Sequence, residues 1–244
     1  MYKFADIHCH IIPYVDDGAY TMQEAVALLR LEYEQGTGVV CLTPHLRAGM
    51  FESSDEKVTE EYVKLRDLIK KENLPLTLYQ SREYHFDKLF RTKLEQGSVR
   101  PLGNSKNLLV EFGGRHTDEA MIAAVQLVKS AGYEPVIAHV ERYAPVQQDL
   151  SFAQVLVDNG AKLQINAGSV LGREGIRQKH LVAKLMKQDL VSAIGSDAHD
   201  CNVRTPDLGK CAEYLEKKMS REYADRLLRT GPLDILQHKD FPSE

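Results

Sequence analysis

The chain has 244 residues, of which 43% are hydrophobic and 27% charged, and its formal net charge is −4. This length fits one large domain or two small ones, with ample apolar material for a buried core. No apolar run approaches the ~20 residues of a membrane-spanning helix. The acidic balance, without any basic run, makes nucleic acid an unexpected partner.

The cysteines and the start of the chain bear on where the protein works. The segment Met1–Asp6 lacks the long apolar run and the small-residue cleavage site of a signal peptide. Four cysteines form neither a CxxC pair nor a dense framework: Cys9, Cys41, Cys201 and Cys211. This pattern is typical of reduced thiols. We therefore expect a cytoplasmic protein, and the sequence does not indicate its oligomeric state.

Short apolar runs, each followed by an amphipathic helical pattern, recur along the chain. They predict strands at 2–7, 38–43, 76–81, 107–111, 134–138, 162–166 and 190–195. Continuous apolar runs are typical of parallel strands that are buried on both faces. These β-then-α units favour a barrel of parallel strands, although a doubly wound open sheet would give the same periodicity.

Capping sequences mark the starts of several helices. The segment Thr21-Met-Gln-Glu24 is typical of a capping box, before a helix that ends near Gly36. The segment Ser53-Ser-Asp-Glu56 predicts the start of another helix, and Thr205-Pro206 predicts a proline at a first helical position.

Histidines and acids recur at one point of these units, directly after a strand. The ends of parallel barrel strands converge on one mouth, so these side chains are expected to meet there. His8 and His10 are two residues apart, so on an extended strand end both imidazoles point to the same side and can hold one cation. The full set of candidate ligands is His8, His10, His45, Glu83, Glu111, His139, Asp197 and His199.

Some members of this set, each considered alone, could have a role other than metal binding. Glu83 or Glu111 alone could be an exposed loop carboxylate, and His139 could be a hydrogen-bonded core histidine. Their shared position after successive strands favours ligation. His85 and His116 also lie near the predicted mouth, and the pattern leaves their role open.

Eight nitrogen and oxygen ligands are too many for one ion of four to six coordination, and they predict two or three divalent ions that share carboxylates. Imidazole and carboxylate together suit manganese, iron or zinc. Such a cluster typically activates water for attack on phosphorus or carbon. Three arginines lie two to five residues beyond candidate histidines, and they could clamp a phosphate: Arg47, Arg142 and Arg204. Hydrolysis of a phosphomonoester is therefore favoured over hydrolysis of an amide.

The segment Cys41-Leu-Thr-Pro-His-Leu-Arg47 matches the C-x5-R spacing of cysteine-dependent tyrosine phosphatases. In those enzymes the backbone N–H groups of the loop bind the phosphate and lower the pKa of the thiol. Here the loop has no glycine, Pro44 removes one N–H group, and Cys41 falls inside a predicted buried strand. Chance spacing is the better interpretation.

Several motifs resemble the PHP (polymerase and histidinol phosphatase) family, in the branch of bacterial manganese-dependent protein-tyrosine phosphatases of capsule and exopolysaccharide synthesis. They are Ile7-His-Cys-His10, Asp16-Asp-Gly18, Thr43-Pro-His45, Arg47-Ala-Gly-Met-Phe51, Glu83-Tyr84, Glu111-Phe112, Ile137-Ala-His-Val-Glu-Arg-Tyr143 and Ser196-Asp-Ala-His199. The match runs in order from about residue 5 to Arg204.

The resemblance implies an α/β fold, a distorted TIM-like (β/α)7 barrel, with residues 1–244 forming a single PHP-type metallophosphatase domain. It implies that the strand-end residues bind up to three metal ions, most often manganese. It also implies that Arg142 and Arg204 hold the phosphate with Arg47 nearby, and that Asp17 lies beside the metals as a proton donor. The implied substrate is phosphotyrosine on a partner tyrosine kinase that controls polysaccharide export.

Three other functions remain as alternatives. A small-molecule phosphomonoesterase of the same family, acting for example on histidinol phosphate, would share the metal ligands. An amide hydrolase of the related metal-barrel type often uses a carbamylated lysine, and no lysine stands beside Glu83, Glu111 or His139. A non-catalytic binding module would be expected to have lost some of the ligands.

Overall fold

The structure is a computed structural model, which describes residues 4–114 and 116–238. Within these residues, parallel strands form two sheets, ordered β1-β2-β4 and β3-β5-β6-β7-β8-β9. The strands are β1 (Phe4–Cys9), β2 (Thr37–Leu42), β3 (His45–Leu46), β4 (Thr77–Gln80), β5 (Glu83–His85), β6 (Asn107–Glu111), β7 (Glu134–Ile137), β8 (Lys162–Asn166) and β9 (Ala193–Gly195). Every predicted strand has a counterpart, although residues 2 and 3 of the first prediction lie outside the described residues.

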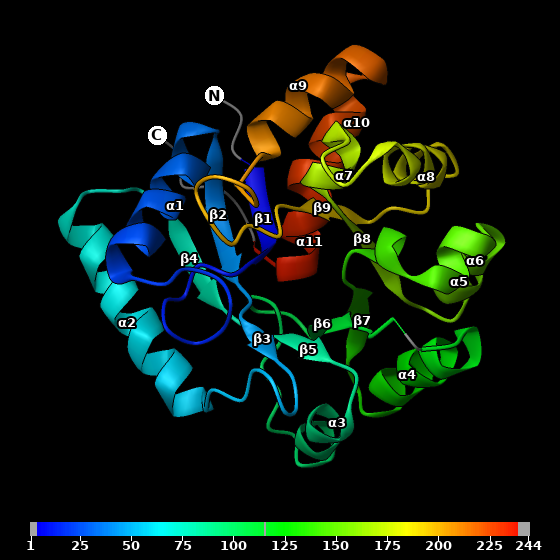
Figure 1. Cartoon of the computed structure of the whole chain (residues 1–244), viewed down its shortest axis with the longest axis horizontal. Helices are drawn as coiled ribbons and strands as arrows, with labels where there is room; N and C mark the ends of the chain where they lie inside the picture. The colour runs from blue at the N-terminus through cyan, green and yellow to red at the C-terminus, as the bar shows by residue number, and fades with distance from the viewer. Residues whose placement is uncertain (1–3, 115, 239–244) are drawn as a thin grey trace.

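Most helices surround the strands (Figure 1). They are α1 (Met22–Glu34), α2 (Asp55–Lys71), α3 (Lys88–Glu95), α4 (Asp118–Ser130), α5 (Ala144–Gln148), α6 (Ser151–Asp158), α7 (Ala167–Leu171), α8 (Ile176–Lys187), α9 (Leu208–Lys218), α10 (Arg221–Asp225) and α11 (Gly231–Leu236), with a 3-10 turn η1 (Val140–Arg142) and a π-helical turn η2 (Arg226–Thr230). No helix among the described residues is long and apolar enough to cross a membrane.

The two sheets are joined by two bent strands. Pro44 lies between β2 and β3, and Arg82 lies between β4 and β5, so each pair continues from one sheet into the other. The ring closes between β9 and β1, where Cys9 pairs with Ala198 and the His10 N–H donates to the Ala198 carbonyl at 2.8 Å. The strands therefore form a distorted (β/α)7 barrel, as predicted, and not an open doubly wound sheet. The two bends were not predicted from the apolar pattern.

The barrel interior is filled with apolar side chains that alternate along the strands, including Ile7, Val39 and Val136. Ile235 of α11 belongs to the same cluster. The Asn107 side chain, at the start of β6, donates to the Ile235 carbonyl at 2.7 Å. Helix α11 therefore covers the amino-terminal end of the barrel, and the opposite end carries the polar residues described below.

Two of the predicted helix starts are confirmed. The Thr21 hydroxyl accepts from the Glu24 N–H at 3.1 Å before α1, and the Ser54 hydroxyl accepts from the Lys57 N–H at 3.2 Å before α2. The prediction for Pro206 is wrong by two residues, because α9 begins at Leu208.

Candidate metal centre

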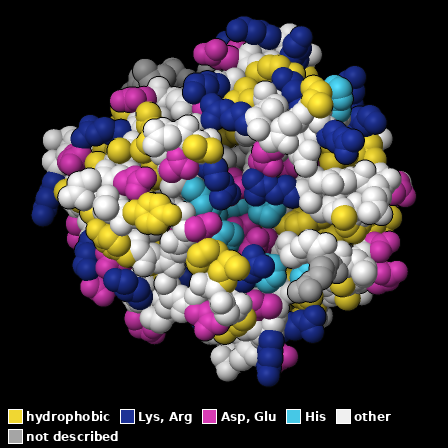
Figure 2. Space-filling model, viewed as in Figure 1, with side chains coloured by type: hydrophobic (Ala, Val, Ile, Leu, Met, Phe, Trp, Pro, Cys, Tyr) yellow, Lys and Arg dark blue, Asp and Glu magenta, His cyan; other side chains and the backbone are white. Residues whose placement is uncertain are grey.

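All eight candidate ligands converge at the carboxyl-terminal mouth of the barrel. Their placement follows from the strands, because each side chain lies on a strand end or in the first residues after it. His8, His10 and Glu83 are fully buried, at 0% exposure. Histidine and acidic side chains occupy a hollow near the middle of this face, with basic side chains beside it and hydrophobic ones around it (Figure 2). Four overlapping groups of ligand atoms lie within this hollow.

The first group joins the first and last strands. The Nε2 atoms of His8 and His10 are 3.2 Å apart, and both lie 3.3 Å from Glu83 Oε2. They lie 3.4 and 3.5 Å from Asp197 Oδ1, respectively. Two carboxylate oxygens thus lie within 3.5 Å of two imidazole nitrogens, and donors of these kinds suit a borderline divalent cation.

Glu83 also belongs to two further groups, one with His139 and one with His45 and Glu111. Its Oε1 lies 2.8 Å from His139 Nε2, and its Oε2 lies 3.0 Å from His45 Nδ1. His45 Nδ1 is in turn 3.4 Å from Glu111 Oε1. Glu83 is therefore placed as a carboxylate that two ions could share.

Asp17 lies at a third point, on the outer side of the hollow. Its Oδ1 is 3.6 Å from His45 Nε2 and 3.5 Å from His199 Nε2, and His10 belongs to the same group. Burial would raise the pKa of the Asp17 carboxyl, but the neighbouring His199 outweighs it and lowers this pKa well below its usual range. Asp17 is thus a carboxylate among imidazoles, a setting suited to a ligand.

The buried polar atoms of this hollow provide a test of whether a cation fits. Glu83 Oε2, His45 Nδ1 and His199 Nε2 are buried, and none of them has a hydrogen-bond partner among the described residues. Such atoms are costly to bury without a hydrogen bond, and divalent cations bound to the ligand groups would satisfy them. Both nitrogens of His45 face candidate groups, but a neutral imidazole has one lone pair to give, so His45 can serve only one ion at a time.

The second ring nitrogens of four histidines are held by neighbouring groups. The Nδ1 atoms of His8, His10, His139 and His199 lie 3.0 Å from Gln164 Oε1, 2.7 Å from Asp16 Oδ2, 3.1 Å from the Tyr143 hydroxyl and 2.9 Å from the Asp197 carbonyl, respectively. The acceptor oxygens beside His8, His10 and His199 favour the tautomer that leaves Nε2 free to bind a cation, whereas the Tyr143 hydroxyl beside His139 can donate or accept. The sequence analysis assigned no role to Gln164, and only its place as a polar residue in an apolar strand could have signalled one.

The Asp16-Asp-Gly18 motif forms a tight loop over the end of β1, and the structure explains why Asp16 and Gly18 are required there. The Asp16 carboxylate accepts from the His45 N–H at 2.9 Å as well as contacting His10. A Cβ atom at Gly18 would lie 1.9 Å from the His10 carbonyl oxygen, so only glycine lets this loop close over the strand end. Asp17 reaches the hollow because of this close approach.

Two candidate ligands have left-handed backbone. His139 has φ 33° and Asp197 has φ 54°. For residues other than glycine this conformation costs about 1–3 kcal/mol, and it is found mainly where surrounding contacts or function require it. Here it aims both side chains into the hollow.

Charges within the hollow shift several pKa values in the metal-free protein. Burial disfavours charged His8, but Glu83 and Asp197 outweigh it and raise its pKa to about 9. In the same way, Glu83 and Glu111 outweigh burial and raise the pKa of His45 to about 11. Burial and the nearby His10 lower the pKa of His199 to about 4. Burial and Glu83 would raise the pKa of Glu111, but hydrogen bonds from His45 and His85 lower it to about 2.

His85, whose role the sequence left open, is a neighbour of this cluster. Its Nδ1 lies 3.1 Å from Glu111 Oε1.

Two of the three predicted arginines lie beside Asp197. Arg142 NH1 and Arg204 NH2 are 2.9 and 2.8 Å from Asp197 Oδ2, whereas Asp197 Oδ1 faces the histidines. Both line a cleft of about 270 Å³ that also includes Asp197. Arg47, which follows β3, is not among the residues that line this cleft.

Arg142 is held by a residue that the sequence analysis missed. The Glu174 carboxylate accepts from Arg142 Nε at 3.0 Å and from Arg142 NH2 at 2.8 Å. Together with the bond to Asp197, this pairing fixes the plane of the guanidinium group. Glu174 lies in the loop between α7 and α8, where no motif marked it.

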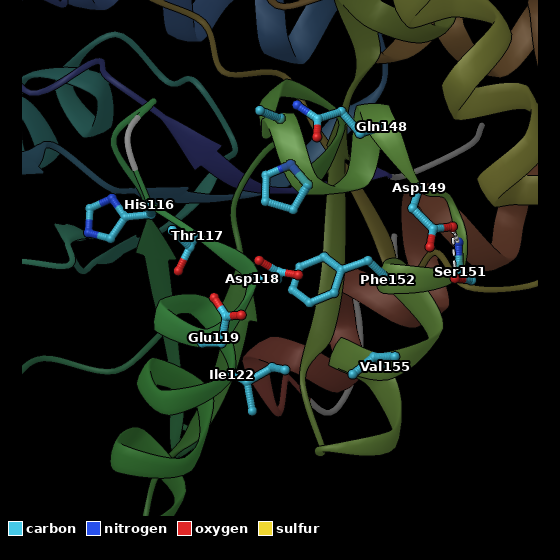
Figure 3. A pocket seen from close by; sticks show the side chains of 12 residues that line it. His116, Thr117, Asp118, Glu119, Ile122, Gln148, Asp149, Ser151, Phe152 and Val155 are labelled. Atoms are coloured by element: carbon cyan, nitrogen blue, oxygen red, sulfur yellow. Dashed lines mark hydrogen bonds between the residues drawn. The ribbon is translucent and has the colours of Figure 1, made fainter.

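Two other features, Cys41 and a second cavity, are weaker candidates for an active site than this centre. Cys41 is fully buried in the barrel interior, and burial raises its pKa to about 12, so its thiol is inert. A cavity of about 620 Å³ lies between the start of α4 and helices α5 and α6, with Asp118, Glu119 and Asp149 in its lining (Figure 3). None of its lining residues belongs to the four ligand groups.

Comparisons with known proteins identify the family of this chain. Residues 4–237 match the family described as capsular polysaccharide synthesis, CpsB/CapC. The tyrosine-protein phosphatase CpsB of Streptococcus pneumoniae is 30% identical over 236 residues, covering 95% of this chain and 97% of the relative. The tyrosine-protein phosphatase YwqE of Bacillus subtilis is 30% identical over 228 residues, covering 93% and 90%.

Solved structures support the same grouping. One, described as belonging to YwqE from Bacillus subtilis and CpsB from Streptococcus pneumoniae, unique metal-dependent tyrosine phosphatases, has a TM-score of 0.88 at 29% identity and covers 97% of this chain and 96% of that chain. A phosphotriesterase homology protein from Escherichia coli has a TM-score of 0.60 at 13% identity, covering 97% and 98%, and shares the fold alone. The resemblance predicted from the motifs is confirmed. The chain belongs to the CpsB/CapC family of capsular polysaccharide synthesis proteins.

Proposed function

We propose that this chain is a metal-dependent phosphatase that hydrolyses phosphotyrosine in proteins, built as one metallophosphatase domain over residues 1–244. One observation carries the proposal. Buried atoms of Glu83, His45 and His199 that have no hydrogen-bond partner among the described residues lie in the ligand groups, beside an arginine pair anchored on Asp197. A cluster of divalent ions next to two guanidinium groups suits a phosphate ester, and the named relatives are tyrosine phosphatases.

The centre would hold two or three divalent ions. We assign His8, His10 and Asp197 to the first ion, together with Glu83, which lies 3.3 Å from both imidazoles. The second ion would take His45, Glu83 and Glu111, together with His139, which lies 2.8 Å from Glu83. Asp17 and His199 would bind a third ion, and His45 would serve either the second ion or the third. Manganese is the proposed metal, since imidazole and carboxylate donors suit it, and iron or zinc would accept the same donors.

Each side chain then has a definite task. Divalent ions at such a site lower the pKa of water and neutralise charge on phosphoryl oxygens. Arg204 gives one N–H group to Asp197 and keeps its others for the phosphate, whereas Glu174 and Asp197 together occupy three N–H groups of Arg142. Arg204 would therefore donate most of the hydrogen bonds to the phosphate, and Arg142 would donate fewer from a fixed position.

The leaving group needs little help. A tyrosyl oxygen leaves as a phenolate whose conjugate acid has a pKa of about 10, so it is a good leaving group without full protonation. The lowered pKa of Asp17 keeps this carboxyl ionised at neutral pH. We therefore propose Asp17 as a metal ligand instead of the proton donor that the family resemblance implied.

The biological substrate would be a tyrosine kinase of capsule or exopolysaccharide synthesis, carrying phosphotyrosine. The family is one of capsular polysaccharide synthesis, and its named relatives act on phosphotyrosine. All four cysteines are free thiols, which is typical of a reducing compartment, and we place the enzyme in the cytoplasm.

The test is release of phosphate from a phosphotyrosyl peptide before chelation, after chelation and after manganese is added back. We expect activity to disappear with the chelator and to return with manganese. Histidinol phosphate serves as the comparison substrate, and faster hydrolysis of it than of the peptide would favour the small-molecule alternative. Activity that survives complete metal removal would refute the metal mechanism.

A further inference from the structure

The exposed hydrophobic side chains are unevenly distributed over the molecule. Eight large hydrophobic residues are exposed among the described ones, and five of them are more than half exposed. These five are Val203 at 76%, Tyr20 at 71%, Ile176 at 63%, Met50 at 59% and Tyr14 at 53%. The other three, Tyr33, Met219 and Val155, are only 38–42% exposed.

The five most exposed residues share one end of the barrel. Four of them lie between the end of a strand and the helix that follows it, and Ile176 is the first residue of α8, the second helix after β8. They come from four separate segments, after β1, β3, β8 and β9. In a parallel barrel these segments surround the mouth that holds the active residues. We call Tyr14, Tyr20, Met50, Ile176 and Val203 the apolar rim.

Val203 and Met50 adjoin residues of the candidate metal centre. Val203 lines the cleft that contains Arg142 and Arg204. Tyr20 is three residues beyond Asp17, and Met50 precedes Phe51, whose ring stacks on the His45 imidazole with 5.1 Å between centroids. Single exposed hydrophobic residues are ordinary, but their gathering around a polar hollow marks a surface that contacts a partner.

From this placement we infer that the apolar rim binds the polypeptide around the phosphotyrosine, so that the enzyme prefers a folded or extended protein chain over a small phosphate ester. The inference rests on the proposed function. Contacts with all four segments require the polypeptide on either side of the phosphotyrosine, because the tyrosyl phosphate itself would be held at the metal centre. A second copy of this protein on the same face would instead cover the mouth and block the substrate.

The test compares two substrates, O-phosphotyrosine and an autophosphorylated tyrosine kinase domain. The variants Met50→Ser and Tyr20→Ser alter the rim, and Met219→Ser and Tyr33→Ser are controls that change the same residue types at the far ends of α9 and α1. All four side chains are exposed, so the fold should be kept. Each rim variant should lose about fivefold in kcat/KM on the phosphoprotein, as expected for one lost apolar contact, and stay within about twofold on O-phosphotyrosine.

Three results would overturn this inference. Rim variants could lose activity on both substrates equally, or rim and control variants could behave alike on the phosphoprotein. Rim variants could instead convert an oligomer to a monomer while hydrolysing the phosphoprotein normally, which would make the rim a self-association surface. Failure of the proposed function is distinct, because the wild-type protein would then hydrolyse neither substrate with manganese present.

Discussion

Binding of metal ions to this centre should release protons in a number set by the histidines. In the metal-free protein at pH 7, His8 with a pKa of about 9 and His45 with a pKa of about 11 are both almost fully protonated. A histidine must lose its proton before it can bind a metal. His199, with a pKa of about 4, is already neutral, and Glu111, with a pKa of about 2, is already ionised.

The expected release at pH 7 is therefore about two protons, with an added fraction from His10, whose pKa is also raised. Release should fall as the pH rises through about 9, because His8 then loses its proton before the metal arrives. Calorimetric titration of the metal-free protein with manganese, repeated in buffers of different ionisation enthalpy, measures this number.

Two variants make the measurement specific. His45→Gln should release one proton fewer, whereas His180→Gln, on the outer helix α8, should release as many as the wild type. A release near zero at pH 7 with full metal binding would refute the reasoning, because it would mean that the carboxylates do not keep these histidines charged.

Further outcomes follow from the same geometry. Arg142→Ala should leave manganese content unchanged and reduce phosphatase kcat/KM by about 100-fold, and Glu174→Gln should raise KM about tenfold with a smaller change in kcat, both checked by steady-state kinetics and elemental analysis. Cys41→Ser should retain metal-dependent turnover, since this thiol is buried in the barrel interior. The folded-state pKa of His8 is raised from 6.5 to about 9. The contribution of His8 to the stability of the metal-free protein, on the order of 3 kcal/mol, should therefore be lost as the pH rises from about 6.5 to above 9. His45, with a pKa of about 11, should add to the loss measured by urea unfolding over this range.

The sequence was most informative where one physical rule governed a whole segment. Continuous apolar runs marked the buried parallel strands, and the capping residues Thr21 and Ser54 marked two helix starts. The bends at Pro44 and Arg82 were not predicted, because periodicity does not indicate which neighbour a strand end pairs with. Pro206 was misplaced because a proline before a helix need not occupy its first turn.

The candidate site likewise contains residues that could be predicted from the sequence and residues that could not. The eight candidate ligands could be selected because they all occupy the same position after a strand, and the structure brings them together. Gln164 and Glu174 could not be selected, because their roles depend on which side chains from other strands lie beside them. The lowered pKa of Asp17 likewise depends on its distance to His199, a quantity that spacing along the chain does not contain.

The central claim is that Glu83 and its neighbours form a metal centre beside a phosphate clamp. The most direct measurement is anomalous diffraction at the manganese edge from crystals grown with manganese and phosphate. The account predicts one manganese peak among His8, His10, Glu83 and Asp197 and a second on the other side of Glu83, with phosphate bound between the ions and Arg204. Crystals that contain manganese, but with no peak in contact with Glu83, would contradict it.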